Sequence, residues 1–307
     1  MSTPLEALRG AAGARVEAQA KVNLRLKILA REASGFHQLE TLFLRLALAD
    51  TVRVRRTAGT RSLDVAGLSE TSDIGPVERN LAWRAADAYL DAVRWPGGFA
   101  IELEKRIPIG GGLGGGSADA GAVLRALDAI APSPLGEPAL LRLAATLGAD
   151  VPFLASEHAY ALGWGRGERL LALPAPPARR VVLLVPPFAV NTAAAYGWLT
   201  EARAAAAGPA TAAGVLDLMA LGDWEALAGL ARNDFEPVVA AHRPEIAQLV
   251  AGLRAAGCSP AMMSGSGSVV FGILAADAEK CLLTLSAASS AMMTSTATRV
   301  EPVVPLD

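Results

Sequence analysis

Two stretches near the start of the chain alternate apolar and polar positions. Residues 22–29 (VNLRLKIL) and 44–56 (LRLALADTVRVRR) carry an apolar side chain at nearly every second position. A period of two is typical of strands that bury one face, so both stretches predict the antiparallel start of a sheet. Residues 99–107 (FAIELEKRI) alternate in the same way until Pro108 ends the pattern.

Helical spacing of apolar residues appears between and after these strands. It predicts a helix at 80–93 and another after the glycine-rich stretch that follows Pro108, where Val123, Leu127 and Ile130 share one face. Residues 138–149 (PALLRLAATLGA) predict a helix closed by Gly148.

The second half continues to mix the two kinds of element. Residues 151–170 are interpreted as strand and turn, and the apolar runs at 181–185 (VVLLV) and 268–274 (SVVFGIL) as strands. Helices are expected within 193–231 and at 244–257. Strands and helices follow one another without a strict βαβα rhythm, which favours an α+β fold over a doubly wound parallel sheet.

A chain of 307 residues is long for one core and short for three, so two domains are expected. The proline-rich stretch 173–180 (LPAPPARR) is the best candidate for a junction. We expect one domain at residues 1–165 and a second at residues 166–307.

Composition narrows the function. Lys and Arg number 28 against 30 Asp and Glu, so no long-range charge attracts nucleic acid or anionic lipid, and an anionic ligand needs a local site. Two cysteines without CxxC spacing and three histidines disfavour a disulfide scaffold and a zinc site. The chain has no apolar run of the roughly 20 residues that span a bilayer. Together with an N-terminus unlike a signal peptide, this predicts a cytoplasmic protein with no membrane or nucleic-acid partner.

Residues 108–119 (PIGGGLGGGSAD) place six glycines directly before the second predicted helix. A helix N-terminus offers unpaired N–H groups and a partial positive charge, and glycines let the backbone approach a phosphate and adopt positive φ. Ser117 could touch a phosphate or Mg²⁺, although Ser117 and Asp119 could instead cap the helix. The predicted phosphate-binding residues are Pro108, Gly110, Gly111, Gly112, Leu113, Gly114, Gly115, Gly116 and Ser117.

Two familiar phosphate loops do not fit this stretch. A Walker A loop requires a lysine before its final Ser or Thr, and none follows Gly110 within the loop. A Rossmann fingerprint belongs to the first βαβ unit, whereas this loop comes about a hundred residues into the chain, after antiparallel-like strands. The loop is therefore of a third kind.

Three segments together resemble the motifs of the GHMP kinase superfamily: 18–29 (AQAKVNLRLKIL), 108–120 (PIGGGLGGGSADA) and 262–274 (MMSGSGSVVFGIL). The resemblance implies a two-domain α+β fold, with an N-terminal domain like domain 2 of ribosomal protein S5 and a ferredoxin-like C-terminal domain. It also implies an ATP-dependent kinase that phosphorylates a small alcohol, with residues 1–165 as the N-terminal ATP-binding and catalytic domain and residues 166–307 as the C-terminal substrate-binding domain.

Within that family, residues 34–43 (SGFHQLETLF), 79–86 (RNLAWRAA) and 147–153 (LGADVPF) resemble the members that phosphorylate the 2-hydroxyl of a CDP-linked methylerythritol in non-mevalonate isoprenoid precursor synthesis. Ser34 and Phe36 replace the Asp and Tyr of the usual DGYH; Phe36 keeps an aromatic face and loses the hydroxyl. A homoserine- or mevalonate-type kinase and a catalytically silent nucleotide-binding regulator are the alternatives.

The resemblance also implies roles for individual residues. Asp150 would accept the hydroxyl proton, and Lys21 would keep that carboxylate ionised and stabilise the transferring phosphoryl group. The alternative is a structural ion pair at a domain seam. Asn23 should share a strand face with Lys21 and could bind the methylerythritol hydroxyls, or it could be a satisfied edge residue.

The remaining implied contacts concern the two nucleotide ends. His37 would bind the polar edge of cytosine, Phe36 or Tyr196 would stack on its faces, and Thr192 lies near Tyr196 in sequence; a core tyrosine is the alternative for Tyr196. Asn80 would contact adenine or cap the following helix. ATP and Mg²⁺ are implied by the reaction, without a dedicated carboxylate site for the metal. We expect a monomer or weak dimer.

Overall fold

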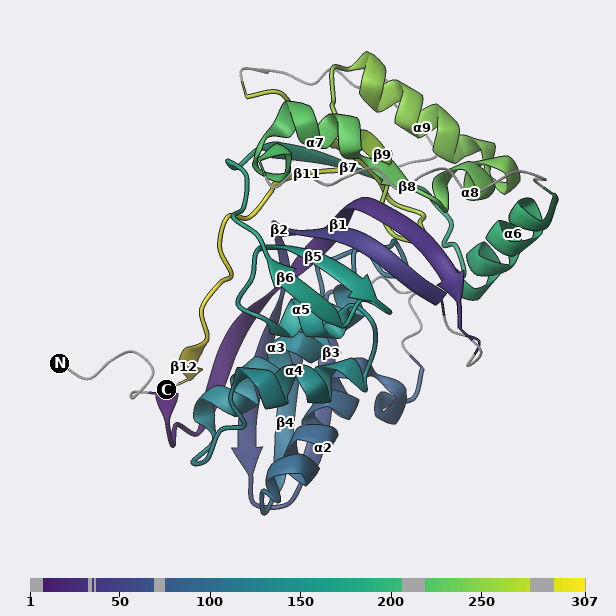
Figure 1. Ribbon diagram of the computed structural model, residues 1–307. Coiled ribbons are helices and arrows are strands. Elements are labelled where there is room, and N and C mark those ends of the chain that lie inside the picture. The colour runs from purple at the N-terminus through teal and green to yellow at the C-terminus, as the bar shows by residue number, and fades with distance from the viewer. Residues whose placement is uncertain are drawn as a thin grey trace.

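The computed structural model describes residues 8–32, 35, 37–68, 75–205, 219–276 and 290–306. These residues form two β-sheets, each with helices packed on it (Figure 1). The arrangement is a mixed α/β structure with two sheets, in agreement with the α+β prediction.

The larger sheet is built around two long antiparallel strands. Its central order is β12-β1-β2-β4-β3, with β5 paired to β2, β6 paired to β5 and β8 beside β1. The strands are β1 (Gly13–Arg31), β2 (His37–Thr57), β3 (Arg61–Ala66), β4 (Gly98–Glu104), β5 (Tyr160–Gly165), β6 (Arg169–Ala172), β8 (Arg232–Asn233) and β12 (Val304–Leu306).

Four helices cover one face of this sheet in the lower half of Figure 1, with the apolar α3 at their centre. They are α2 (Leu81–Val93), α3 (Gly115–Ile130), α4 (Glu137–Ala145) and α5 (Val151–Ala155), preceded by a short 3₁₀ turn at Val77–Arg79. The glycine-rich stretch connects the end of β4 to α3, and β1 and β2 run on from this layer towards the second sheet.

The second sheet has four strands in the order β11-β7-β10-β9, all antiparallel to their neighbours. The elements are β7 (Arg180–Val185), β9 (Ala261–Met263), β10 (Val270–Ile273), β11 (Ser290–Ser295), α6 (Thr192–Ala205), a 3₁₀ turn at Ala220–Gly222, α7 (Trp224–Leu230), α8 (Glu236–His242) and α9 (Pro244–Ala255).

The apolar run in β7 is buried on both of its faces. Val181 and Leu183 pack into the core shared with the larger sheet, whereas Val182 and Leu184 pack with residues of α6, α8 and α9. A strand covered on both sides needs no polar alternation, which explains its continuous apolar sequence.

Most predicted elements are present, with two corrections. Residues 151–155 form α5 rather than part of a strand; strands β5 and β6 occupy only the later part of the stretch. All five α5 residues are buried, so periodicity does not reveal the helix, but Pro152 in its first turn favours a helix start. The helix expected to run to Gly148 ends at Ala145. Strands β3, β8, β9, β11 and β12 and helix α8 were not predicted.

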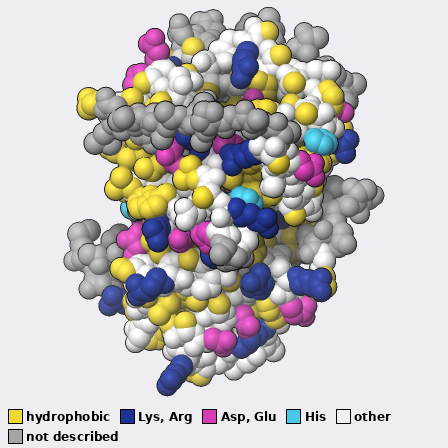
Figure 2. Space-filling model, turned by 45° about the vertical axis from the view of Figure 1, so that its right-hand side comes forward, with side chains coloured by type: hydrophobic (Ala, Val, Ile, Leu, Met, Phe, Trp, Pro, Cys, Tyr) yellow, Lys and Arg dark blue, Asp and Glu magenta, His cyan; other side chains and the backbone are white. Residues whose placement is uncertain are grey.

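Charged side chains of both signs are interspersed on the face shown in Figure 2, among apolar and neutral atoms. This agrees with the near-neutral net charge. No helix within the described ranges combines the length and apolar character needed to cross a bilayer.

Candidate active site

The middle of β1 presents its polar side chains to a pocket. Lys21 and Asn23 point to the same side, while Ala20, Val22 and Leu24 between and beside them are buried in the core. Lys21 Nζ donates a hydrogen bond to Asn23 Oδ1 at 2.7 Å. The prediction that these two side chains share a face is confirmed, and it follows from the period-two geometry of a strand.

The glycine-rich loop curls where its glycines have positive φ. Gly110, Gly112 and Gly114 have φ of +70°, +79° and +73°, a region that side-chain-bearing residues rarely adopt. A Cβ on Gly114 would also lie 3.0 Å from two carbons of the Lys21 side chain. The lack of a side chain at Gly114 therefore leaves room for the Lys21 side chain next to the start of α3.

A second glycine turn, residues 264–267, packs against this loop. A Cβ on Gly112 would lie 2.1 Å from the Ser264 carbonyl oxygen. The Ser264 hydroxyl donates to the Gly112 carbonyl at 2.9 Å, and the Val269 N–H donates to the Gly111 carbonyl at 3.1 Å. The turn therefore supports the glycine loop.

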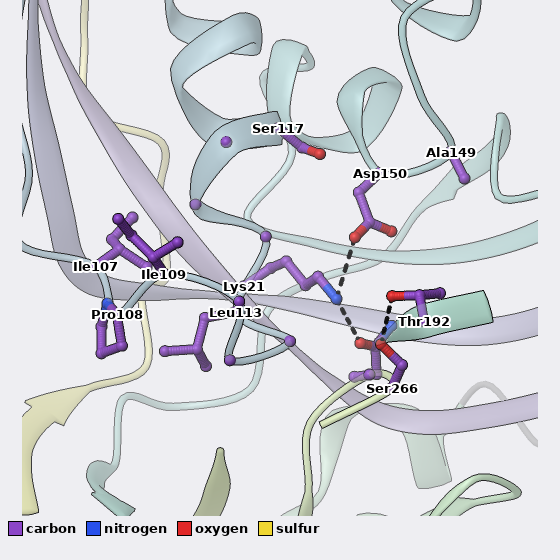
Figure 3. A pocket seen from close by; sticks show the side chains of 18 of the residues that line it. Lys21, Ile107, Pro108, Ile109, Leu113, Ser117, Ala149, Asp150, Thr192 and Ser266 are labelled. Carbon is purple, nitrogen blue, oxygen red and sulfur yellow. Dashed lines mark hydrogen bonds and ion pairs between the residues drawn. The ribbon is translucent and has the colours of Figure 1, made fainter. Parts of the chain in front are cut away.

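Lys21 and Asp150 form an ion pair in the pocket, with Lys21 Nζ and Asp150 Oδ2 3.2 Å apart (Figure 3). The Lys21 side chain is 4% exposed, whereas that of Asp150 is 31% exposed. Asp150 lies in the turn between α4 and α5 and does not cap α5 through its side chain. The lysine is thus buried as a fixed positive charge, and the carboxylate remains open to a ligand.

The pocket holding this pair has a volume of about 700 Å³ and runs from the glycine loop to α6. At the α6 end, the Thr192 and Ser266 hydroxyls lie 2.9 Å apart (Figure 3). The structure brings these predicted residues together along its wall: Lys21, Asn23, Asn80, Pro108, Gly110, Gly111, Gly112, Leu113, Gly114, Gly115, Gly116, Ser117, Asp150, Thr192 and Tyr196.

His37 lies next to this pocket, in a second cavity of about 1340 Å³ whose wall shares Thr192 and Tyr196 with the first. The His37 and Tyr196 rings are stacked, with centroids 4.6 Å apart. Burial, with the positive charges of Arg31 and Arg203, lowers the pKa of His37. A neutral imidazole can both donate and accept hydrogen bonds. Phe36, the other predicted stacking residue, lies outside the described residues, as does Ser34.

The capping alternatives for the site residues have different outcomes. Asn80 caps α2, because its side-chain oxygen accepts the Ala82 N–H at 2.9 Å, and it also lines the pocket. At α3 the N-cap is Gly114, and no side chain caps the helix. The capping interpretation of Ser117 and Asp119 is therefore wrong.

Asp119 belongs to a buried ion cluster that sequence reasoning missed. Lys105 Nζ lies 2.6 Å from Asp119 Oδ2 and 2.5 Å from Asp50 Oδ2. Burial would lower the pKa of Lys105, but the two carboxylates raise it, so the lysine is protonated. Burial also raises the pKa of Asp119, and its Oδ1 atom is buried without a hydrogen-bond partner. Lys105 and Asp119 line the pocket beside the start of α3.

Comparison with known proteins identifies relatives along nearly the whole chain. Residues 80–158 match the family model of the GHMP kinases N terminal domain, and residues 215–290 match that of the GHMP kinases C terminal. The 4-diphosphocytidyl-2-C-methyl-D-erythritol kinase of Solibacter usitatus is 40% identical over 261 residues, which cover 85% of this chain and 81% of the relative. The enzyme of that name from Heliobacterium modesticaldum is 35% identical, with 86% and 87% covered.

Solved structures give the same result. A crystal structure of 4-(cytidine 5'-diphospho)-2C-methyl-D-erythritol kinase superposes with a TM-score of 0.73 at 36% identity, covering 92% of this chain and 98% of that one. The homoserine kinase of Cytophaga hutchinsonii superposes with a TM-score of 0.64 at 17% identity, covering 95% and 98%. The second similarity shows the fold alone.

Proposed function

Since the chain belongs to the 4-diphosphocytidyl-2-C-methyl-D-erythritol kinases of the GHMP kinase family, we propose that it transfers the γ-phosphoryl group of ATP to the 2-hydroxyl of that CDP-linked substrate in the non-mevalonate route to isoprenoid precursors. The products are ADP and the 2-phosphate. The observation that carries this proposal is the position of the Lys21–Asp150 pair, between the glycine loop at one end of the pocket and Tyr196 at the other.

Different parts of the pocket bind ATP, accept the proton and orient the acceptor. The glycine loop and the start of α3 hold the ATP phosphates through backbone N–H groups, and Asn80 borders the adenosine end. Asp150 accepts the proton of the attacking hydroxyl, while the buried Lys21 ammonium pairs with Asp150 and stabilises negative charge on the transferring group. Asn23, hydrogen-bonded to Lys21, orients the acceptor hydroxyls.

The acceptor's cytidine lies between the two cavities. Tyr196 and the adjacent His37 are already stacked there, with Thr192 beside them, so a flat pyrimidine finds an aromatic face and an imidazole edge at one place. The negative charge of Asp150 and, more strongly, burial raise the pKa of Tyr196, which keeps its hydroxyl protonated as a donor. Phe36 completes this end in our proposal.

Mg²⁺ accompanies ATP in this scheme and neutralises phosphate charge. The described residues contain no group of three or more His, Cys, Asp or Glu side chains suited to a metal. In our proposal the ion would keep mostly phosphate and water ligands, with the Ser117 hydroxyl at the start of α3 as the protein oxygen. We also propose a domain boundary near residue 165, a cytoplasmic location, and a monomer or weak dimer.

Calorimetric titration tests the acceptor assignment. CMP or CDP should bind beside His37 and Tyr196 in addition to a non-hydrolysable ATP analogue at the glycine loop. A His37→Ala variant should lose the cytidine ligand and keep the ATP analogue. Binding of the ATP analogue without any binding of CMP or CDP would remove the cytidine assignment and favour a GHMP kinase with a different acceptor.

A further inference from the structure

Residues 232–236 (RNDFE) connect the two ends of the active site, and of these five residues only Phe235 lines the pocket that holds Lys21 and Asp150. The segment begins as β8, which pairs in parallel with Arg25 and Leu26 of β1. β1 is the strand that carries Lys21. From this position successive side chains of the segment reach in two directions, towards the second glycine turn and towards α6.

Asn233 holds the glycine turn. Its side chain is buried, and Nδ2 donates to the Met263 carbonyl at 2.8 Å and to the Gly265 carbonyl at 2.7 Å. Its Oδ1 accepts the Phe235 N–H at 2.9 Å, which fixes the orientation of the amide. All three hydrogen bonds of the amide are thus made with backbone groups: one with the turn itself, one with Met263 directly before the turn, and one with Phe235.

That turn is in direct contact with the phosphate end of the pocket. It packs against Gly111 and Gly112 as described above, and a Cβ on Gly265 would lie 3.4 Å from Lys21 Nζ. Without Asn233, the Met263 and Gly265 carbonyls lose a buried donor, and the turn is held less firmly against the glycine loop. Buried carbonyls without a partner are costly, so relaxation of the turn is expected.

Asp234 holds α6. Its Oδ2 accepts the Ile28 N–H at 3.0 Å and pairs with Arg203 Nη2 at 2.9 Å, and its Oδ1 pairs with Arg232 Nε at 2.8 Å. Arg203 lies in the last turn of α6 and also donates to the Ile28 carbonyl at 2.7 Å. The carboxylate therefore ties the far end of α6 to the end of β1.

The next residue, Phe235, contacts the proposed acceptor site. The Phe235 ring packs edge-on against Tyr196, with centroids 4.8 Å apart and an interplanar angle of 86°. Tyr196 is stacked on His37 through its own ring. The orientation of the proposed cytidine face thus depends on α6 and on Phe235, both of which are fixed by the 232–236 segment.

We propose that Asn233 and Asp234 are positioning residues with separate targets: Asn233 sets the phosphate end through the 264–267 turn, and Asp234 sets the acceptor end through α6. The inference rests on the proposed function for the identity of the acceptor. It explains why Asn233 and Asp234 are buried and use their amide and carboxylate atoms in hydrogen bonds and ion pairs, although neither side chain lies at the reacting atoms. A displacement of about 1 Å at such a site can lower the rate by about 10²-fold.

The test compares ligand affinity and kinetics in Asn233→Ala and Asp234→Asn. Asn233→Ala should weaken ADP binding and lower kcat by roughly tenfold or more, while CMP affinity stays within about twofold. Asp234→Asn should do the reverse, raising the Kd for CMP and the KM for the acceptor while ADP affinity is retained. Asn233→Asp keeps the acceptor for Phe235 but loses both donations to the turn, so it should behave like Asn233→Ala.

Asp128→Asn serves as the control for loss of stability alone. Asp128 accepts the Tyr89 hydroxyl at 2.8 Å and the Leu135 N–H at 2.6 Å, away from the pocket. Its variant should unfold at a lower temperature with unchanged affinities for ADP and CMP. The proposal is overturned if folded Asn233→Ala and Asp234→Asn bind both ligands like the wild type, or if each weakens both ligands equally. Absence of CMP binding in the wild type would instead refute the cytidine assignment, and the ADP measurement on Asn233→Ala would still decide the role of Asn233.

Discussion

Replacing Asp150 by asparagine removes the proposed base and keeps the size of the side chain. The carboxylate is 31% exposed and lies 3.2 Å from Lys21 Nζ. An amide oxygen can still accept from that ammonium, which also keeps its hydrogen bond to Asn23. An ion pair with a partly exposed member contributes about 1 kcal/mol or less, so stability should change by no more than that.

The effect on catalysis should be far larger than the effect on stability. A positioned general base contributes about 10²–10⁴-fold to the rate, or about 3–5 kcal/mol of transition-state stabilisation. Because Asp150 acts on the acceptor hydroxyl, kcat should fall by this factor while the KM for ATP changes little. Asp150→Ala should be equally slow but less stable, because it leaves the buried Lys21 ammonium with one partner fewer.

The assay is ADP release at saturating ATP with the CDP-linked acceptor, with thermal unfolding measured in parallel. A Lys21→Met variant completes a double-mutant cycle: if the pair acts as a unit, the double variant is no slower than the slower single variant. Asp150→Asn that keeps more than about a tenth of the wild-type kcat would refute the base, since a working base contributes at least about 10²-fold. The pair would then be a structural ion pair.

Three further results are expected. Gly112→Ala should weaken ADP binding by more than about tenfold, as expected for a misplaced loop, because a Cβ there would lie 2.1 Å from the Ser264 carbonyl oxygen. The control is Gly136→Ala, at a glycine with a similar φ of +74° and open space around it, and this variant should lose stability only. Equal ADP affinity of the two variants would contradict the prediction. The KM for the acceptor should rise as the pH falls through the pKa of His37, which lies below its ordinary value of 6.5. A wild-type KM that does not change with pH in this range would rule out a neutral His37 in binding. Burial raises the pKa of Asp119 from 3.8 to about 7, so between these values the folded state holds a proton that the unfolded state releases. The free energy of unfolding should therefore fall as the pH rises through this range. Urea denaturation of Asp119→Asn should not show this fall, and a pH dependence identical to that of the wild type would show that another group is responsible.

The parts of the site that depend on local sequence were predictable. The glycine loop can be recognised from the sequence for two reasons. Glycine is the residue that readily adopts the positive φ found at Gly110, Gly112 and Gly114, and a predicted helix begins directly after the loop. The common direction of Lys21 and Asn23 follows from strand periodicity alone. The pairing of Lys21 with Asp150 required the family resemblance, since the two lie far apart in sequence.

The parts that depend on three-dimensional packing were not predictable. Lys105, Asp50 and Asp119 come from the end of β4, from β2 and from α3, and no spacing in the sequence indicates that they meet. Asn233 gives no local signal either, because its partners are backbone carbonyls contributed by a distant turn. Asp119 could have been singled out only as a carboxylate in the first half of a largely apolar helix, most of whose residues are buried.

Turnover of the wild-type protein tests the central claim most directly. ADP release is measured with ATP and, in turn, the CDP-linked methylerythritol, homoserine and mevalonate at equal concentrations, with Asp150→Asn as the blank. The account predicts rapid turnover with the CDP-linked acceptor and ADP release at the blank rate with the other two. No ADP release above the blank with the CDP-linked acceptor, or faster release with homoserine or mevalonate, would contradict it.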